Sequence, residues 1–210
     1  GQDPAAVEAA AVESGLRVAI PYDTVEGHTT HANANVRVEL IRGPQAWTVN
    51  TKTNAYRWFY ADFNTVPADI QSGDKVKVTD LAGGAPVEVN CLLTGSVNVS
   101  SDAVSGAAPS GNQVDVYIRT PSTYYGDIPP GVDHARANAS GGAYNVAFPG
   151  TDVRNGDAAV IFSTDSAGHQ VMNLARTGAV EVVYPQYDEV MGYHIPATKV
   201  TVKAGSATRM

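Results

Sequence analysis

The chain of 210 residues is long enough for one large domain or two of ordinary size, and its 43% of hydrophobic residues is typical of a folded protein. It carries 21 acidic and 14 basic residues, a net charge of −7, which disfavours nucleic acid and anionic lipid as partners because like charges repel. No stretch approaches about 20 consecutive apolar residues, so we expect no direct membrane insertion.

Residues 1–15 are expected to form an N-terminal linker or a short helix. The Ala-rich run from Pro4 to Ser14 ends at Gly15, and glycine is a common helix stop. A helix of about 11 residues is only marginally stable in isolation. Both alternatives therefore stay open for this segment.

Beyond residue 15 the composition indicates short strands joined by turns. The chain has 28 Val against 6 Leu and 7 Ile, and the branched side chain of Val suits a pleated sheet. The Val-rich runs are separated by segments rich in Gly, Pro, Ser, Thr and Asn, which are turn formers. The sequence therefore predicts an all-β fold.

An internal repeat organises these strands. The pattern Asp-x-Val-x-Gly occurs at residues 23–27, 102–106 and 188–192, and an alternating strand follows at residues 36–40, 114–118 and 200–202. A Gly-Asp turn comes later in the first two copies, at residues 73–74 and 156–157. This shared order predicts one repeat in residues 16–96, a second in residues 97–180, and the first strands of a partial third repeat in residues 181–210.

Each full repeat of about 80 residues has to bury the apolar faces of its strands by packing two sheets together. We therefore predict two tandem Ig-like antiparallel β-sandwiches plus the partial third repeat. The aromatic segment at residues 56–60 aligns with residues 144–148. This alignment predicts that the following side chains lie in the core: Tyr56, Trp58, Tyr60, Tyr144, Val146 and Phe148.

The Asp-x-Val-x-Gly pattern, the Val-x-Val strand and the Gly-Asp turn resemble tandem bacterial Ig-like or fibronectin-III-like repeats of secreted and cell-surface proteins. The resemblance covers roughly residues 16 to 205. It implies an extracellular or cell-surface location and a stalk, adhesion or accessory-binding module. It brings no catalytic residue to this chain.

The repeated aspartates are expected to be structural. Asp74 and Asp157 hold the same position in two repeats, whereas acid–base chemistry needs two carboxyls in one cleft. Asp23, Asp102 and Asp188 receive the same interpretation as turn residues. An interdomain calcium site is the weaker alternative for these three, since calcium binds several oxygens together.

No metal, cofactor or enzymatic activity is predicted. His28 and His31 lie near each other in sequence, but zinc needs three or four protein ligands. Cys91, the only cysteine, is interpreted as a small buried hydrophobic residue. Neither a nucleophile elbow nor a phosphate-binding loop is present, and no catalytic residue is proposed.

Segments that differ between the repeats are the candidates for binding. The interval from Val116 to Tyr144 spans 28 residues, against 18 from Val38 to Tyr56, and the excess lies in a Tyr- and Pro-rich segment at residues 121–134. Rigid aromatic side chains give large contact area at little entropic cost. The candidate binding residues are Tyr124, Tyr125, Asp127, Trp47, Phe59 and Phe63. The alternative is that these aromatic residues cap the sandwich ends or pack between repeats.

The sequence favours a non-enzymatic extracellular structural or adhesion segment of a cell-surface protein, which contacts protein or glycan surfaces through its loops. The alternatives are an accessory carbohydrate-binding region of a secreted hydrolase and a subunit of a strand-exchanged extracellular filament. Residues 181–210 are expected either to pack on the second repeat or to self-associate by adding to the sheet edge of a neighbour.

Overall fold

The computed structural model describes residues 15–119 and 133–177, together with the backbone of four short strands between residues 179 and 209. These residues form β-strands apart from two short 3-10 helices, η1 (Ile20–Tyr22) and η2 (Phe63–Thr65), and the connecting turns. The predicted all-β fold is confirmed. The possible helix at residues 4–14 lies outside the described residues.

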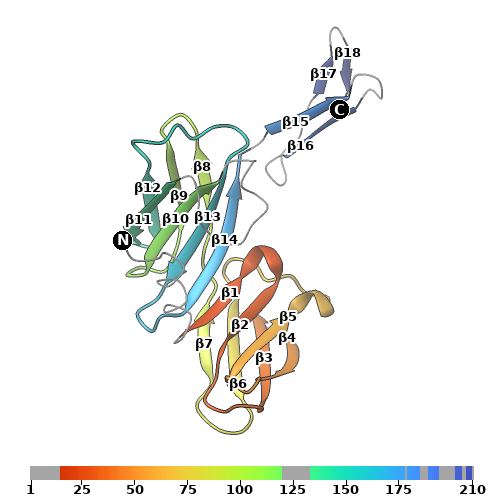
Figure 1. Ribbon diagram of the computed structural model, residues 1–210, viewed down its shortest axis with the longest axis vertical. Helices are drawn as coiled ribbons and strands as arrows, with labels where there is room; N and C mark the ends of the chain where they lie inside the picture. Colours follow the sequence, from red (N-terminus) through yellow and green to blue (C-terminus); the bar gives the residue numbers. More distant parts are fainter. Residues whose placement is uncertain are drawn as a thin grey trace.

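Strands β1 to β7 form two facing layers (Figure 1). One layer has the order β1-β2-β5 and the other β4-β3-β6-β7, with antiparallel neighbours throughout each layer. Alternate residues of a strand point to one face, and in β3 the inward set of Val36, Val38 and Leu40 is fully buried between the layers. The bounds are β1 (Leu16–Ala19), β2 (Thr24–His28), β3 (Asn35–Arg42), β4 (Gln45–Lys52), β5 (Trp58–Asp62), β6 (Lys75–Asp80) and β7 (Val87–Asn90).

Strands β8 to β14 repeat this arrangement. The order β8-β9-β12 corresponds to β1-β2-β5, and β11-β10-β13-β14 corresponds to β4-β3-β6-β7. Most buried apolar residues of both strand sets belong to one continuous core cluster. The bounds are β8 (Ser96–Asn98), β9 (Ala103–Ala107), β10 (Gln113–Arg119), β11 (Asp133–Asn138), β12 (Ala143–Ala147), β13 (Ala158–Thr164) and β14 (Gln170–Arg176).

The first hairpin of each copy has the same pairing register. Val18 lies opposite Val25 in β1–β2, and Val97 lies opposite Val104 in β8–β9. The hairpin of β15 (Ala179–Tyr184) and β16 (Glu189–Tyr193) pairs Val183 with Val190 in the equivalent way. In all three hairpins the paired residues lie five positions before and two positions after the aspartate of the repeated pattern. A further hairpin joins β17 (Val202–Ala204) and β18 (Ala207–Arg209).

The Asp-x-Val-x-Gly pattern has a physical cause in its aspartate. Asp23 and Asp102 have left-handed backbone φ angles of 56° and 45°, a conformation that Asp tolerates better than most residues. Each carboxylate accepts a hydrogen bond from a distant backbone N–H, that of Ile70 at 2.6 Å and that of Val153 at 2.9 Å. The aspartate therefore forms a corner and ties it to the turn that precedes the sixth strand of the set.

The glycine of the same pattern allows a close approach of the preceding strand. A Cβ at Gly27 would lie 2.8 Å from Cδ2 of Leu16 and 3.0 Å from the carbonyl oxygen of Gly15, and a Cβ at Gly106 would lie 2.1 Å from the carbonyl oxygen of Thr94. Real Cβ atoms are essentially never found closer than 3.0 Å to such an atom. The recurrence of this glycine therefore follows from packing within each strand set.

The prediction that Tyr56, Trp58 and Tyr60 lie in the core is wrong. Tyr56 is 81% exposed and Tyr60 is 45% exposed, while Trp58 is half-buried. The buried residues of this segment are instead Phe59, Ala61 and Phe63.

The cause of this error is a shift of alignment by three residues. Val25 pairs with Ala61 as Val104 pairs with Val146, so Phe59 and not Tyr56 corresponds to Tyr144. An odd shift exchanges the two faces of a strand. The core positions expected for Tyr144, Val146 and Phe148 are confirmed, because these side chains are 5%, 2% and 1% exposed.

Candidate functional site

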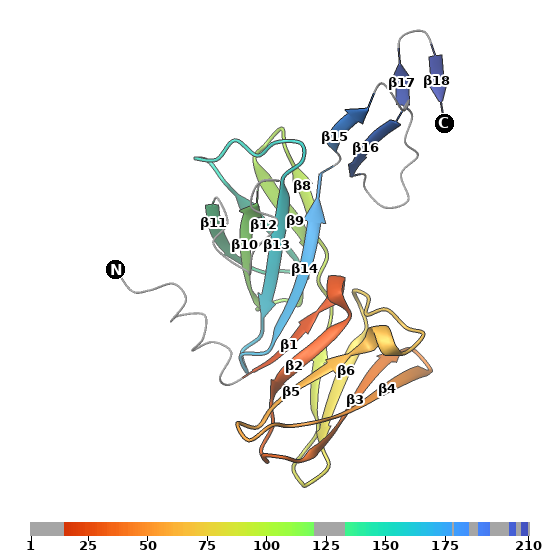
Figure 2. The same ribbon diagram turned by 45° about the vertical axis from the view of Figure 1, so that its right-hand side comes forward.

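The two strand sets are joined by a parallel strand pair, the exception to the expected antiparallel pairing. Strand β1 of the first set pairs with β14 of the second, with Arg17 opposite Gln170 and Ala19 opposite Met172. Figure 2 shows β1 running beside β14 where the two sets meet. Their pairing makes one seven-stranded sheet of the order β11-β10-β13-β14-β1-β2-β5. A sheet that continues through both sets restricts their relative motion.

Side chains reinforce this junction. The backbone N–H of Leu16 donates to Nδ1 of His169 at 3.1 Å, and the Arg17 guanidinium donates to Oε1 of Gln170 at 3.4 Å. The same guanidinium lies 5.8 Å from the ring centre of Phe162, within the range of a cation–π interaction. On this face of the sheet Ala19 of the first set is buried in one cluster with three residues of the second, Val160, Phe162 and Met172.

The connecting segment between β7 and β8 is tied to both strand sets. Cys91 and Leu93 are both fully buried. The backbone N–H of Leu93 donates to Oγ of Ser72 at 3.1 Å, and its carbonyl accepts from Nδ2 of Asn173 at 2.8 Å. Burial raises the pKa of the Cys91 thiol to about 12, so the thiol stays protonated and behaves as the small apolar residue that was expected.

The first strand set has no strand segment equivalent to the part of β14 that pairs with β1. Val87 pairs with Val78 as Asn173 pairs with Ile161, so the residues corresponding to the β1-paired segment 170–172 are 84–86. In the first set these residues form a Gly-Ala-Pro loop before β7 begins. Proline has no backbone N–H to donate to a neighbouring strand. The longer β13–β14 hairpin is therefore what allows β14 to pair with β1.

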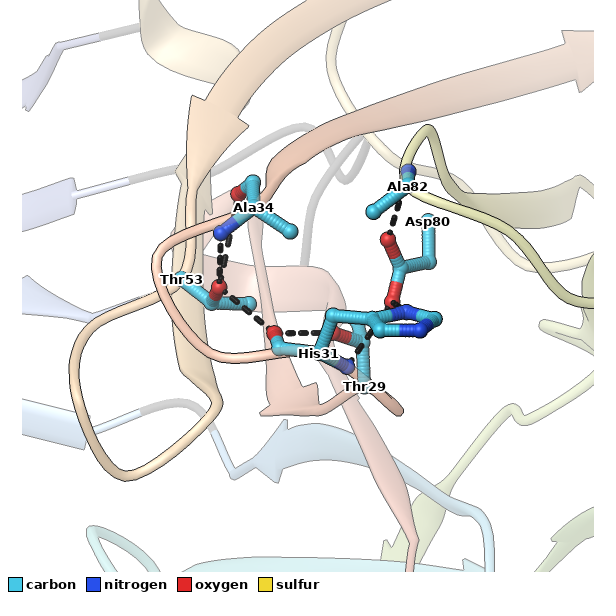
Figure 3. A network of polar contacts seen from close by, with 6 residues as sticks. All are labelled: Thr29, His31, Ala34, Thr53, Asp80 and Ala82. Carbon is cyan, nitrogen blue, oxygen red and sulfur yellow. Dashed lines mark hydrogen bonds and ion pairs between the residues drawn. The ribbon is translucent and has the colours of Figure 1, made fainter.

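A polar network lies at one end of the first strand set (Figure 3). The Asp80 carboxylate accepts from the backbone N–H of His31 at 3.0 Å and from that of Ala82 at 3.0 Å, and it lies 2.9 Å from Nδ1 of His31. Burial by itself would raise the pKa of Asp80, but these hydrogen bonds and one from Thr29 together hold it below its ordinary value. Oγ1 of Thr53 joins the loop by donating to the carbonyl of His31 at 2.9 Å.

A cavity of about 350 Å³ lies beside this network. His28, Arg57 and Asp80 contribute its charged and titratable side chains, and Gly83 and Gly84 contribute backbone. The Asp80 carboxylate is engaged by the hydrogen bonds described above. The arrangement holds the loops at residues 29–34 and 81–86 together.

A second polar cluster, which sequence reasoning missed, lies on strands β10 and β11. The Asp115 carboxylate accepts from Nε2 of Gln113 at 2.8 Å and Nε of Arg136 at 2.7 Å, and it lies 2.8 Å from Nε2 of His134. The rings of Tyr117 and His134 stack with centres 4.4 Å apart. The alternating polar residues of β10 were visible in the sequence. Their partners on β11 follow the long segment at residues 120–132, so their pairing was not.

The predicted binding residues differ in their exposure in the structure. Phe59 and Phe63 are fully buried, so the expectation that they form a contact surface is corrected. Phe59 points between the layers because β5 has the opposite facing to that assumed, and Phe63, the first residue of η2, packs into the same core cluster. Trp47 on β4 is half-buried, packs against the core and lies 5.5 Å from the Arg42 guanidinium. Tyr124, Tyr125 and Asp127 lie outside the described residues.

Within the residues that the structure describes, no three His, Cys, Asp or Glu side chains are grouped as metal ligands. In the same part of the chain, no helix has the length and apolar character needed to span a membrane.

Comparison with known proteins gives similarity only at the level of solved structures. No protein-family model matches the sequence, and a search of curated proteins finds no match. A tetra-tandem repeat from the extending region of a large adhesion protein is similar at 15% identity with a TM-score of 0.27, over 84% of this chain and 54% of that chain. A Ca²⁺-stabilized adhesin of an Antarctic bacterium that binds ice is similar at 18% identity with a TM-score of 0.26, over 76% and 44%.

The FN1–FN3 domains of chicken CNTN1 are similar at 10% identity with a TM-score of 0.24, over 78% of this chain and 64% of that chain. This chain therefore spans less than two thirds of the length of each of these three chains. These three structures are a repeat of an adhesion protein, an adhesin and a set of fibronectin-type domains.

Proposed function

We propose that this chain is a non-enzymatic spacer segment of an extracellular or cell-surface adhesion protein, in which successive β-sandwich repeats are joined without a flexible linker. The observation that carries the proposal is the parallel pairing of β1 with β14 across the two strand sets. A spacer has to transmit orientation along its length, and a shared sheet does so better than a free tether.

The buried connection supports the same role. Flexible linkers between domains are exposed and rich in Gly and Ser, whereas Cys91 and Leu93 are fully buried here. Leu93 is hydrogen-bonded to one residue of each strand set, Ser72 and Asn173. Bending at this point would expose apolar surface and break backbone hydrogen bonds.

We place the repeat boundaries of this array at residues 16–96 and 97–180, with residues 181–210 as the start of a further copy. The register of β15–β16, equal to that of the two earlier hairpins, supports this division. The segment containing Tyr124, Tyr125 and Asp127 is proposed to contact a protein or glycan surface. Self-association through residues 181–210 belongs to the same proposal, as does an extracellular location.

Small-angle X-ray scattering tests the rigid junction. A Gly-Ser pair inserted between Leu92 and Leu93 should loosen the connection and broaden the distribution of interatomic distances. The matched control carries the same insertion in the exposed β3–β4 turn, between Gly43 and Pro44, and should scatter like the parent chain. If the parent chain already scatters as a flexible pair of bodies, the spacer proposal fails.

A further inference from the structure

The first strand set presents an exposed aromatic surface that its fold does not use. Tyr56, Trp58 and Tyr60, which we call the aromatic strip, lie in and just before β5, the edge strand of the seven-stranded sheet. Tyr56 is 81% and Tyr60 45% exposed. The rings of Trp58 and Tyr60 lie 6.2 Å apart at an interplanar angle of only 24°. The two rings are therefore stacked in a nearly parallel orientation, and with Tyr56 they give this face of the first strand set exposed aromatic surface.

The second strand set shows that this fold does not require the stacked pair of rings. Phe59 pairs with Gly27 as Tyr144 pairs with Gly106, so the positions that correspond to Trp58 and Tyr60 are Ala143 and Asn145. The corresponding outward face of β12 in the second set therefore forms without an aromatic residue at these two positions. Exposed apolar surface that the fold does not need commonly marks a binding site.

The polar groups around the strip narrow the chemistry of its ligand. Glu26 lies directly opposite Tyr60 on β2. Asp62 follows on the same face of β5, where its Oδ1 accepts from the backbone N–H and from Nδ2 of Asn64, both at 2.9 Å. Arg17, the adjacent cation on β1, is paired with Glu26 at 3.6 Å. Burial, together with the charges of Asp62 and Glu26, raises the pKa of the Tyr60 hydroxyl, which stays a hydrogen-bond donor at neutral pH.

We propose that the aromatic strip binds a neutral polysaccharide. The C–H faces of pyranose rings are apolar and stack on aromatic rings, while sugar hydroxyls donate to carboxylates such as Glu26 and Asp62. The same carboxylates and the net charge of −7 repel anionic polymers. This role goes beyond the spacer function because it gives the array a ligand of its own. It also favours a glycan over a protein partner for this face.

Affinity electrophoresis of the full chain in gels containing a soluble polysaccharide tests the proposal. The neutral probes are a β-1,4-glucan, a β-1,3-glucan and a galactomannan, with alginate as the anionic comparison. We expect at least one neutral probe to retard the chain and alginate not to do so. Replacing both aromatics with the residues of the second set (Trp58→Ala with Tyr60→Asn) should weaken retardation by about tenfold or more, as for the central residues of an interface.

The matched control is Asn145→Ala, at the position of the second set that corresponds to Tyr60, and it should leave retardation unchanged. The single variant Tyr60→Asn, at an exposed site, should weaken binding even if the double variant folds poorly. Since the chain has two tryptophans, the variant Trp47→Phe leaves Trp58 as the reporter, and its fluorescence should change on binding.

Three results would overturn the proposal: no retardation by any neutral probe, retention of binding in a folded Tyr60→Asn variant, or preferential binding of alginate. None of these results bears on the scattering experiment. Failure of the glycan proposal and failure of the spacer proposal are thus separate outcomes.

Discussion

The junction between the strand sets depends on the absence of a side chain at Gly15. A Cβ at this position would lie 2.0 Å from the carbonyl oxygen of Gly168 and 2.7 Å from its carbonyl carbon. Ordinary van der Waals contact begins at 3.4 Å, and 3.4 − 2.0 gives a displacement of about 1.4 Å needed between two backbone segments. The 3.1 Å hydrogen bond from Leu16 to His169 would not survive such a movement.

We therefore expect Gly15→Ala to destabilise the chain by about 1–3 kcal/mol, the usual effect of forcing extra atoms into a packed site. Urea denaturation measures the loss of stability. Hydrogen exchange of the amides in β1 and in residues 170–172 of β14 locates it, because exchange should accelerate more there than in β9 and β10.

The matched control is Gly150→Ala. A Cβ at Gly150 would have no atom within 4 Å, and the backbone there does not have a left-handed φ, so alanine should be tolerated. Equal stability and equal exchange rates for the two alanine variants would refute the reasoning that the β1–β14 junction depends on this close approach.

Two further predictions concern the aspartates. Asp102→Ala should cost about 1–3 kcal/mol in urea denaturation, because the Val153 N–H loses its acceptor and alanine is strained at a φ of 45°; Asp102→Asn should cost clearly less, and equal losses would contradict this account. Asp80 has a pKa below its ordinary 3.8, so its contribution to stability is full above that value and is lost as the pH falls through the lower folded-state value. Between pH 5 and pH 2 the parent chain should therefore lose more stability than Asp80→Asn, and parallel curves would show that Asp80 is not involved.

Much of the fold followed from the order of residues alone. The excess of Val over Leu indicated strands, and the recurring Asp-x-Val-x-Gly pattern revealed the internal repeat, because the left-handed corner at Asp23 and Asp102 and the close approach at Gly27 and Gly106 are local requirements. Local requirements of backbone conformation restrict residue type at a given position. Such residue preferences can therefore be recognised in the sequence without knowledge of distant contacts.

The facing of β5 could not be read in this way. The segment from Tyr56 to Phe63 places aromatic residues on both faces of the strand. The alternation of residues therefore does not show which of the two faces is buried. The choice was made by pairing with β2, where Val25 meets Ala61. This contact directs Phe59 inward and leaves Trp58 and Tyr60 outward, which creates the aromatic strip.

Only the tertiary structure determined the junction. Leu16 and His169 are separated by 153 positions, and no local pattern in β1 indicates a parallel partner. The pairing depends on the additional length of the β13–β14 hairpin and on the close approach at Gly15. The chain thus encodes each repeat locally, whereas the way the repeats are joined follows from contacts between segments far apart in sequence.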